Sequence, residues 1–234
     1  MKRVLLGVLV LSALGCAPRR VSVPIMPPFI PAPRAVVIWG ESFDRLDPER
    51  WREVNVKRQT TDYQIAELDG RSCLKAESRD GASILVTKLQ VDPDTYEWLS
   101  WEWRVDRLLE GEALRRKDGS DAAARMYVYF KTPGLPWQQR NLDYVWSAAL
   151  PEGTMLGSAY SSQSKIIVVE SGSQHVGKWR RAERNIEEDY RQAFGEDPPE
   201  VVALGLMTDT DDTGGHAVAY FDELQVSRQP RQRR

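Results

Sequence analysis

The sequence predicts an all-β fold, a jelly-roll-like β-sandwich with one short peripheral helix. From Val36 onward, short apolar runs rich in β-branched and aromatic residues follow one another, and Gly, Asp and Pro separate them. Their length and turn spacing are typical of a sandwich or jelly roll. No regular alternation of strand-like runs with long helical runs is visible, which argues against an α/β fold. With 234 residues, of which 41% are hydrophobic, the chain can bury a substantial core.

The first residues have the pattern of an export signal. A Lys-Arg pair precedes an apolar stretch over residues 4–14, which is too short to span a membrane. The following sequence SALGC, ending at Cys16, resembles a bacterial lipobox, in which the cysteine becomes the lipidated first residue of the mature chain. The resemblance implies a signal peptide over residues 1–16 and a lipid anchor in the cell envelope. The residue after the cysteine is Ala17 rather than Asp. In such lipoproteins this implies a location at the periplasmic face of the outer membrane.

The segments on either side of the predicted domain are compositionally distinct. Residues 17–35 are rich in proline, which favours extended, partly polyproline II backbone. We interpret this segment as a stalk that links the lipid to a sandwich domain over residues 36–228. Residues 229–234 are a basic tail that we expect to be disordered. The formal net charge of -2 argues against a nucleic-acid partner.

The candidate strands are short and each is bounded by turn residues. In chain order they are Val36–Phe43, Tyr63–Leu68, Ser72–Ser78, Ser83–Leu89, Trp98–Val105, Arg125–Lys131, Asp143–Ala149, Lys165–Glu170, Val201–Thr208 and Ala217–Val226. Trp101 and Trp103 share a wholly apolar face of one of these strands, so we assign both side chains to the core.

One segment departs from the strand pattern. Arg184–Phe194 places apolar residues at helical spacing, and Gly195 follows as a stop signal. We predict a helix that lies across an edge or an end of the sandwich. Leu109–Ser120 is predicted to be a charged loop, and Pro133–Gln139 a second loop carrying an exposed Trp137.

Three motifs stand in a fixed order along the chain, with the strand sequence LDYVW at 142–146 between the second and the third. They are WEWRV at 101–105, KDGSDAAAR at 117–125 and TDTDDTGG at 208–215. Together they resemble an uncharacterised bacterial family called domain of unknown function three thousand and forty-seven. The similarity covers roughly Glu41–Val226. The family often has two aspartates where Ser120 and Asp121 stand and an asparagine where Asp212 stands, and its name implies no activity.

The two ends of the predicted domain carry a second resemblance. Phe43-Asp44 near the first strand and the final strand Ala219–Val226 are similar to the ends of carbohydrate-binding jelly rolls. This resemblance implies a fold and suggests a glycan ligand only by analogy.

An acidic turn is the candidate metal site. Hard cations such as calcium prefer several oxygen ligands, and clustered carboxylates repel one another without a cation. The candidate ligands are Asp209, Asp211 and Asp212 of the turn, together with Asp121. The spacing lacks the closing Glu of a full calcium loop, which favours the alternative of a turn whose side chains bond their own backbone.

Four residues on two candidate strands form the candidate ligand face. Arg125 and Tyr127 share one strand face, and Tyr144 and Trp146 share another. Such aromatic and cationic groups are suited to lining a concave sheet face and stacking on sugar rings. A buried arginine needs a partner, so the alternative for Arg125 is a structural pair with Asp121.

No catalytic signature is visible in the sequence. The nucleophile elbow, the zinc-protease motif and a glycine-rich phosphate loop are all missing. We therefore predict a non-catalytic binding module that recognises a glycan or another envelope component. One alternative is a structural or protein-interaction lipoprotein, which would expose a large apolar patch. The other is a carbohydrate-active enzyme, which would need two carboxyl groups facing one cleft.

Overall fold

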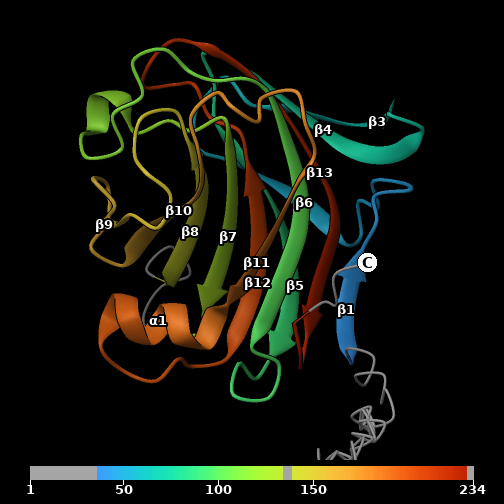
Figure 1. Ribbon diagram of the computed structural model, residues 1–234, viewed down its shortest axis with the longest axis vertical. Coiled ribbons are helices and arrows are strands. Elements are labelled where there is room, and N and C mark those ends of the chain that lie inside the picture. Colours follow the sequence, from blue (N-terminus) through green and yellow to red (C-terminus); the bar gives the residue numbers. More distant parts are fainter. Residues whose placement is uncertain (1–35, 134–138, 231–234) are drawn as a thin grey trace, which may run out of the picture. The chain divides into compact units, whose positions relative to one another are not determined.

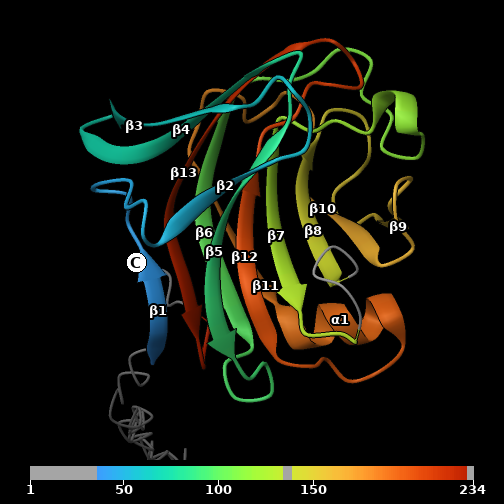
Figure 2. The ribbon, with the colours of Figure 1, turned by 180° about the vertical axis from the view of Figure 1, so that it is seen from behind.

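The computed structural model describes residues 36–133 and 139–230. These residues form two β-sheets that pack face to face (Figure 1, Figure 2). The expected signal peptide with Cys16, the proline-rich stalk, Trp137 and most of the basic tail lie outside the described residues. Within the described residues, no helix is both long and apolar enough to cross a membrane.

The first sheet has six strands in the order β11-β6-β13-β4-β3, with β1 paired to β13. The bounds are β1 Val37–Glu41, β3 Asp62–Leu68, β4 Arg71–Arg79, β6 Trp98–Arg107, β11 Arg180–Asn185 and β13 His216–Ser227. The second sheet has seven strands in the order β2-β5-β12-β7-β8-β10-β9. Its bounds are β2 Trp51–Asn55, β5 Ser83–Val91, β7 Ala124–Phe130, β8 Arg140–Ser147, β9 Met155–Gly157, β10 Ser164–Ser171 and β12 Val201–Met207.

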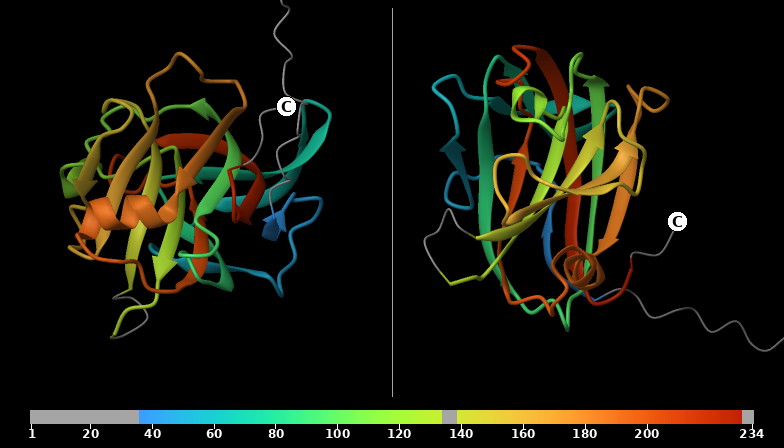
Figure 3. Two further views of the ribbon diagram at one scale, coloured as in Figure 1. Left: turned by 60° about the horizontal axis from the view of Figure 1, so that its bottom comes forward. Right: turned by 90° about the vertical axis from the view of Figure 1, so that its left-hand side faces the viewer.

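The predicted all-β, jelly-roll-like sandwich is confirmed. Each candidate strand corresponds to an observed one, whereas β2, β9 and β11 were not predicted. The helix is α1, Ile186–Phe194, and it lies at one end of the sandwich (Figure 1, Figure 3). The Asn185 side chain caps its first turn by accepting a hydrogen bond from the Glu188 N–H at 2.9 Å. Gly195, in the left-handed conformation, ends it.

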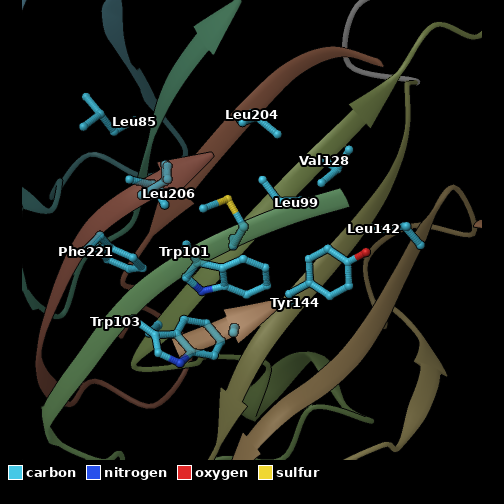
Figure 4. Packing of buried hydrophobic residues seen from close by; sticks show 14 of the residues in the cluster. Leu85, Leu99, Trp101, Trp103, Val128, Leu142, Tyr144, Leu204, Leu206 and Phe221 are labelled. Atoms are coloured by element: carbon cyan, nitrogen blue, oxygen red, sulfur yellow. The ribbon is translucent and has the colours of Figure 1, made fainter. Parts of the chain in front are cut away.

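The core lies between the two sheets and is rich in large aromatic side chains. Trp101 and Trp103 of β6 are buried, as predicted, and their rings meet edge to face at 5.3 Å. Tyr144 of β8 packs on Trp101 with ring centroids 5.4 Å apart (Figure 4). These contacts join the sheets because β6 and β8 belong to different layers.

Candidate functional site: a groove on the seven-stranded sheet

The outward face of the seven-stranded sheet carries a groove of about 1280 Å³. Strands β2, β5, β12, β7 and β8 form its floor, and the segment after β9 forms part of its rim. Figure 2 shows this sheet on the near side of the sandwich. The alternate residues of these strands fill the core, so each strand contributes every second side chain to the groove.

Strand pairing arranges the groove residues in rows across the sheet. One row consists of Val54, Ile84, Met207 and Arg125. The next consists of Val86, Gly205, Tyr127 and Asp143. The first row therefore changes from apolar at β2 to charged at β7. The second changes from apolar Val86 of β5 to polar residues of β7 and β8, with Arg52 of β2 at its outer end.

Two tyrosines of β7, which we call the tyrosine platform, lie side by side in the middle of the groove. The rings of Tyr127 and Tyr129 are stacked, with centroids 5.6 Å apart and planes 22° apart. Gly205 of β12 lies beside them, and a Cβ there would come within 3.2 Å of the Tyr129 ring and 3.0 Å of Ile84. A glycine at this position leaves space for both rings, and both remain partly exposed to the groove.

Arg125 lies in the same face but is a buried anchor, with 3% of its side chain exposed. Its guanidinium donates to Asp209 Oδ1 at 2.8 Å, to Asp143 Oδ2 and to the Ser120 carbonyl. Burial opposes its charge, but the two aspartates hold the pKa of Arg125 well above its usual value. The alternative predicted a structural ion pair between Arg125 and Asp121. Arg125 does form a structural ion pair, but its partners are Asp143 and Asp209.

The two aspartates bound to Arg125 carry one negative charge more than the guanidinium neutralises. Burial raises the pKa of Asp143 to about 6 and that of Asp209 to about 7, although Arg125 acts in the opposite direction. Asp143 lines the groove, and its Oδ1 is buried and has no hydrogen-bond partner among the described residues. Most buried polar atoms have a hydrogen-bond partner, so this unpaired acceptor at the floor of the groove is unusual.

Tyr144 and Trp146 do not belong to the groove, which corrects the predicted ligand face. Both are completely buried in the core. The Tyr144 hydroxyl donates to Asp189 Oδ2 at 2.8 Å, and the Trp146 indole donates to the Gly172 carbonyl at 3.1 Å. The physical reason is alternation, because Asp143 and the other odd-numbered neighbours of β8 point outward and the two rings point inward.

Three of the four predicted metal ligands lie together at one end of the groove. Carboxylate oxygens of Asp121, Asp211 and Asp212 are within 4.8 Å of one another. Asp209 is not in this group and instead binds the buried arginine. Asp121 Oδ2 accepts hydrogen bonds from the Thr213 N–H and hydroxyl, both at 2.7 Å. The turn is thus held by a side chain from outside it, which differs from the alternative of a turn whose side chains bond their own backbone.

The other two carboxylates of this acidic group also have partners. Lys57 places its ammonium 3.0 Å from Asp211 Oδ2, and this hydrogen bond raises the pKa of Lys57. The Tyr160 hydroxyl donates to Asp212, whose pKa is raised by burial. The Lys57 ammonium thus supplies positive charge next to the acidic group, so a metal would have to compete with it.

An apolar wall on the β2 side of the tyrosines was not predicted. We use this name for Val54, Val56, Ile84, Val86, Val202 and Met207. Strand β2 was missed altogether, and β5 is apolar on both faces over Ile84–Val86, so its pattern does not identify the outward side. One signal in the sequence could have identified the outward face of β5. The polar residues Lys88 and Gln90 lie on the same strand face as Ile84 and Val86, so that face is the exposed one.

Comparison with solved structures finds similar sandwiches. The family 11 carbohydrate-binding module of a cellulosomal cellulase of Clostridium thermocellum is 10% identical, with a TM-score of 0.47, and the match covers 83% of this chain and 95% of that one. A xylan-binding domain from Paenibacillus barcinonensis is 13% identical, with a TM-score of 0.40, and the match covers 84% and 96%. At such identities the likeness concerns the fold alone.

Comparison at the level of sequence gives a family. No curated protein matches the chain. A family model described as "Protein of unknown function (DUF3047)" matches residues 49–225, which include every groove strand. The chain therefore belongs to the DUF3047 family, as its three motifs predict.

Proposed function

We propose that this protein is a non-catalytic binding protein of the cell envelope and that its groove holds a glycan. The observation that carries the proposal is the pair of partly exposed tyrosine rings, Tyr127 and Tyr129, that lines the groove beside polar groups of β8. A sugar ring has apolar C–H faces and hydroxyl edges. The faces fit on the tyrosine rings, while Asn141 and Asp143 lie in reach of the edges.

The partners of the groove carboxylates support a binding role. Asp143 and Asp209 hold Arg125, Asp211 pairs with Lys57, and Glu200 pairs with Lys131 at 3.2 Å. Glycoside hydrolysis needs two carboxyl groups that flank the same bond and are free to act. Among the described groove carboxylates only Asp212 has no cation as a partner, and it accepts a hydrogen bond from the Tyr160 hydroxyl, so two free carboxyl groups do not face each other there.

The envelope location is part of the proposal and rests on the sequence. The export signal ending at Cys16 and the proline-rich stalk would display the domain from a lipid anchor, at the periplasmic face of the outer membrane. Mass spectrometry of the N-terminal peptide from the native host tests this. We expect a diacylated cysteine at position 16 and none in a Cys16→Ala chain.

A glycan array tests the binding role. Residues 34–234, which form one compact unit, would be applied with and without calcium. We expect binding that is lost in Tyr129→Ala and retained in Tyr220→Ala, a control tyrosine on the outward face of the other sheet. Equal loss in both variants, or no glycan bound by the parent domain, would contradict the proposal. The second result would favour the alternative of a protein-interaction lipoprotein.

Calcium remains a proposal for the acidic group of Asp121, Asp211 and Asp212. These residues offer carboxylate oxygens of the type that calcium prefers, with Lys57 as the competing cation. If calcium assists glycan binding, chelator should weaken binding on the array. If chelator leaves glycan binding unchanged, calcium has no role in glycan recognition.

A further inference from the structure

The apolar wall is larger than a sugar ring alone requires. It runs from the edge strand β2 across β5 to β12, beside the tyrosine platform. Its outermost members, Val54 and Val56, are 51% and 48% exposed. Exposed apolar side chains that lie side by side in a groove, rather than singly, mark a surface that another molecule covers. A ring stacked on Tyr127 and Tyr129 would leave these valines in water.

The charges in the groove limit the kind of molecule that can cover it. Lys57 and Lys131 are paired with acids, and Arg125 is buried between two of them. Among the described residues that line the groove, only Lys88 is a cation without an acidic partner. One exposed lysine does not form a cluster able to hold a phosphate- or carboxylate-rich head group. The groove therefore favours a neutral polar part.

We infer that the ligand is an amphiphile, a neutral sugar that carries a hydrocarbon chain. The sugar lies on Tyr127 and Tyr129 with its hydroxyls toward Asn141 and Asp143. The chain extends over the apolar wall toward β2 and covers Val54 and Val56. This inference rests on the proposed glycan binding and adds the hydrocarbon part to it.

Alkyl glycosides test the two parts separately. Methyl, hexyl and octyl β-D-glucosides and β-D-galactosides would be titrated into residues 34–234 by calorimetry, below the concentrations at which they form micelles. We expect the Kd to tighten by about fourfold for each CH2 that becomes buried on the wall. Hexanol and octanol, which lack the sugar, should bind at least tenfold more weakly than the matching glycosides.

Paired variants locate the chain. Val54→Ser combined with Val56→Ser should remove most of the gain from methyl to octyl while leaving the methyl glycoside unchanged. Val37→Ser combined with Ile38→Ser is the matched control, because these residues are 45% and 47% exposed on β1, outside the groove. All four positions are exposed, so folding should survive, and thermal melting checks this.

The outcomes separate the inference from the proposed function. A Kd that does not depend on chain length, or a chain-length gain that survives the Val54/Val56 variant, overturns the amphiphile, and array binding would still support a glycan. Alkanols that bind as tightly as the glycosides overturn the glycan and leave only a hydrocarbon site. Failure of every glycoside to bind overturns the inference as well.

Discussion

The two outward faces of the sandwich use their exposed side chains in opposite ways. On the six-stranded sheet, charged residues of different strands neutralise one another, as in the pair of Arg71 on β4 and Glu102 on β6 at 2.6 Å. On the seven-stranded sheet, three outward residues of β2 and β5 are aliphatic and line the groove, namely Val54, Ile84 and Val86. Many charged residues of the first face have partners within the molecule, and apart from Val37 and Ile38 on β1 this face leaves little apolar area exposed. The second leaves apolar area exposed inside a groove, which points to a partner.

Aromatic rings show the same contrast. Trp179 lies over the guanidinium of Arg71, 3.5 Å from the ring centroid, and reaches Tyr220 at 6.4 Å. Its ring is thus used within the molecule to cover a charged strand face. The rings of Tyr127 and Tyr129 meet only each other and the sheet beneath them. Both side chains are partly exposed in the groove.

The largest expected effect is on stability, when a buried arginine of one face is removed rather than an exposed arginine of the other. Arg125→Met should lower the free energy of unfolding by about 3–5 kcal/mol at pH 7, because it leaves Asp143 and Asp209 buried without their cation. Arg79→Met, which removes a 65% exposed arginine from Glu77 on the other sheet, should cost at most about 1 kcal/mol. Urea unfolding measures both, and equal costs would contradict the assignment of Arg125 as a buried anchor.

Stability should depend on pH with opposite signs on the two faces. Burial raises the pKa of Asp143 to about 6, so the folded state holds more protons than the unfolded state between about pH 4 and 6. Its contribution therefore falls as pH rises through that window. The Lys75 hydrogen bond, aided by His216, lowers the pKa of Glu77 to about 2, so its contribution is lost as pH falls below about 4.5.

Single variants separate the contributions of Asp143 and Glu77 to the pH dependence of stability. Asp143→Asn should flatten the stability curve between about pH 4 and 6, and Glu77→Gln should flatten it below about pH 4.5, each by roughly 1–2 kcal/mol. Variants are needed because burial also raises the pKa of Asp222, on the six-stranded sheet, to about 6. Denaturant unfolding across this range measures the curves. An Asp143→Asn curve parallel to that of the parent would rule out a titrating carboxyl at this position.

Tyr144 was predicted to contact the ligand but lies in the core, and Tyr144→Phe tests this correction. The change removes the hydroxyl that donates to Asp189 at 2.8 Å, and Arg184 still satisfies that carboxylate. We expect a loss of about 1 kcal/mol in the free energy of unfolding. Binding of any glycan found on the array should not change, whereas Tyr127→Ala, which removes a ring of the tyrosine platform, should weaken it. If Tyr144→Phe keeps full stability but loses glycan binding, Tyr144 is a ligand contact after all.

The fold could be predicted because most strands have a strong apolar pattern. The missed strands lack that pattern for physical reasons. In β11, RRAERN, only Ala182 is buried, and in β2, WREVN, only Trp51 is. Both are edge strands whose remaining side chains lie in water, so they read as polar loops.

The site was only partly predictable because alternation groups residues without saying which group faces the core. It correctly placed Arg125 with Tyr127, and Tyr144 with Trp146. The polar neighbour Asp143 made the second pair look exposed, whereas Asp143 is itself the outward residue and is neutralised by Arg125. That ion pair depends on the pairing of β7 with β8, Tyr127 opposite Asp143, which sequence spacing alone does not determine.

The smallest expected effect concerns the acidic end of the groove, where an internal cation stands beside three carboxylates. Lys57→Met should change the free energy of unfolding by less than about 1 kcal/mol, because the lysine side chain is 50% exposed. It also frees Asp211, so calorimetric titration should show tighter calcium binding than in the parent domain. Lys131→Met, which removes the same charge from the pair with Glu200, is the matched control and should not gain affinity. If neither the parent nor Lys57→Met takes up calcium, the acidic group only shapes its turn, and a ligand at this end of the groove meets hydrogen-bonding oxygens without a metal.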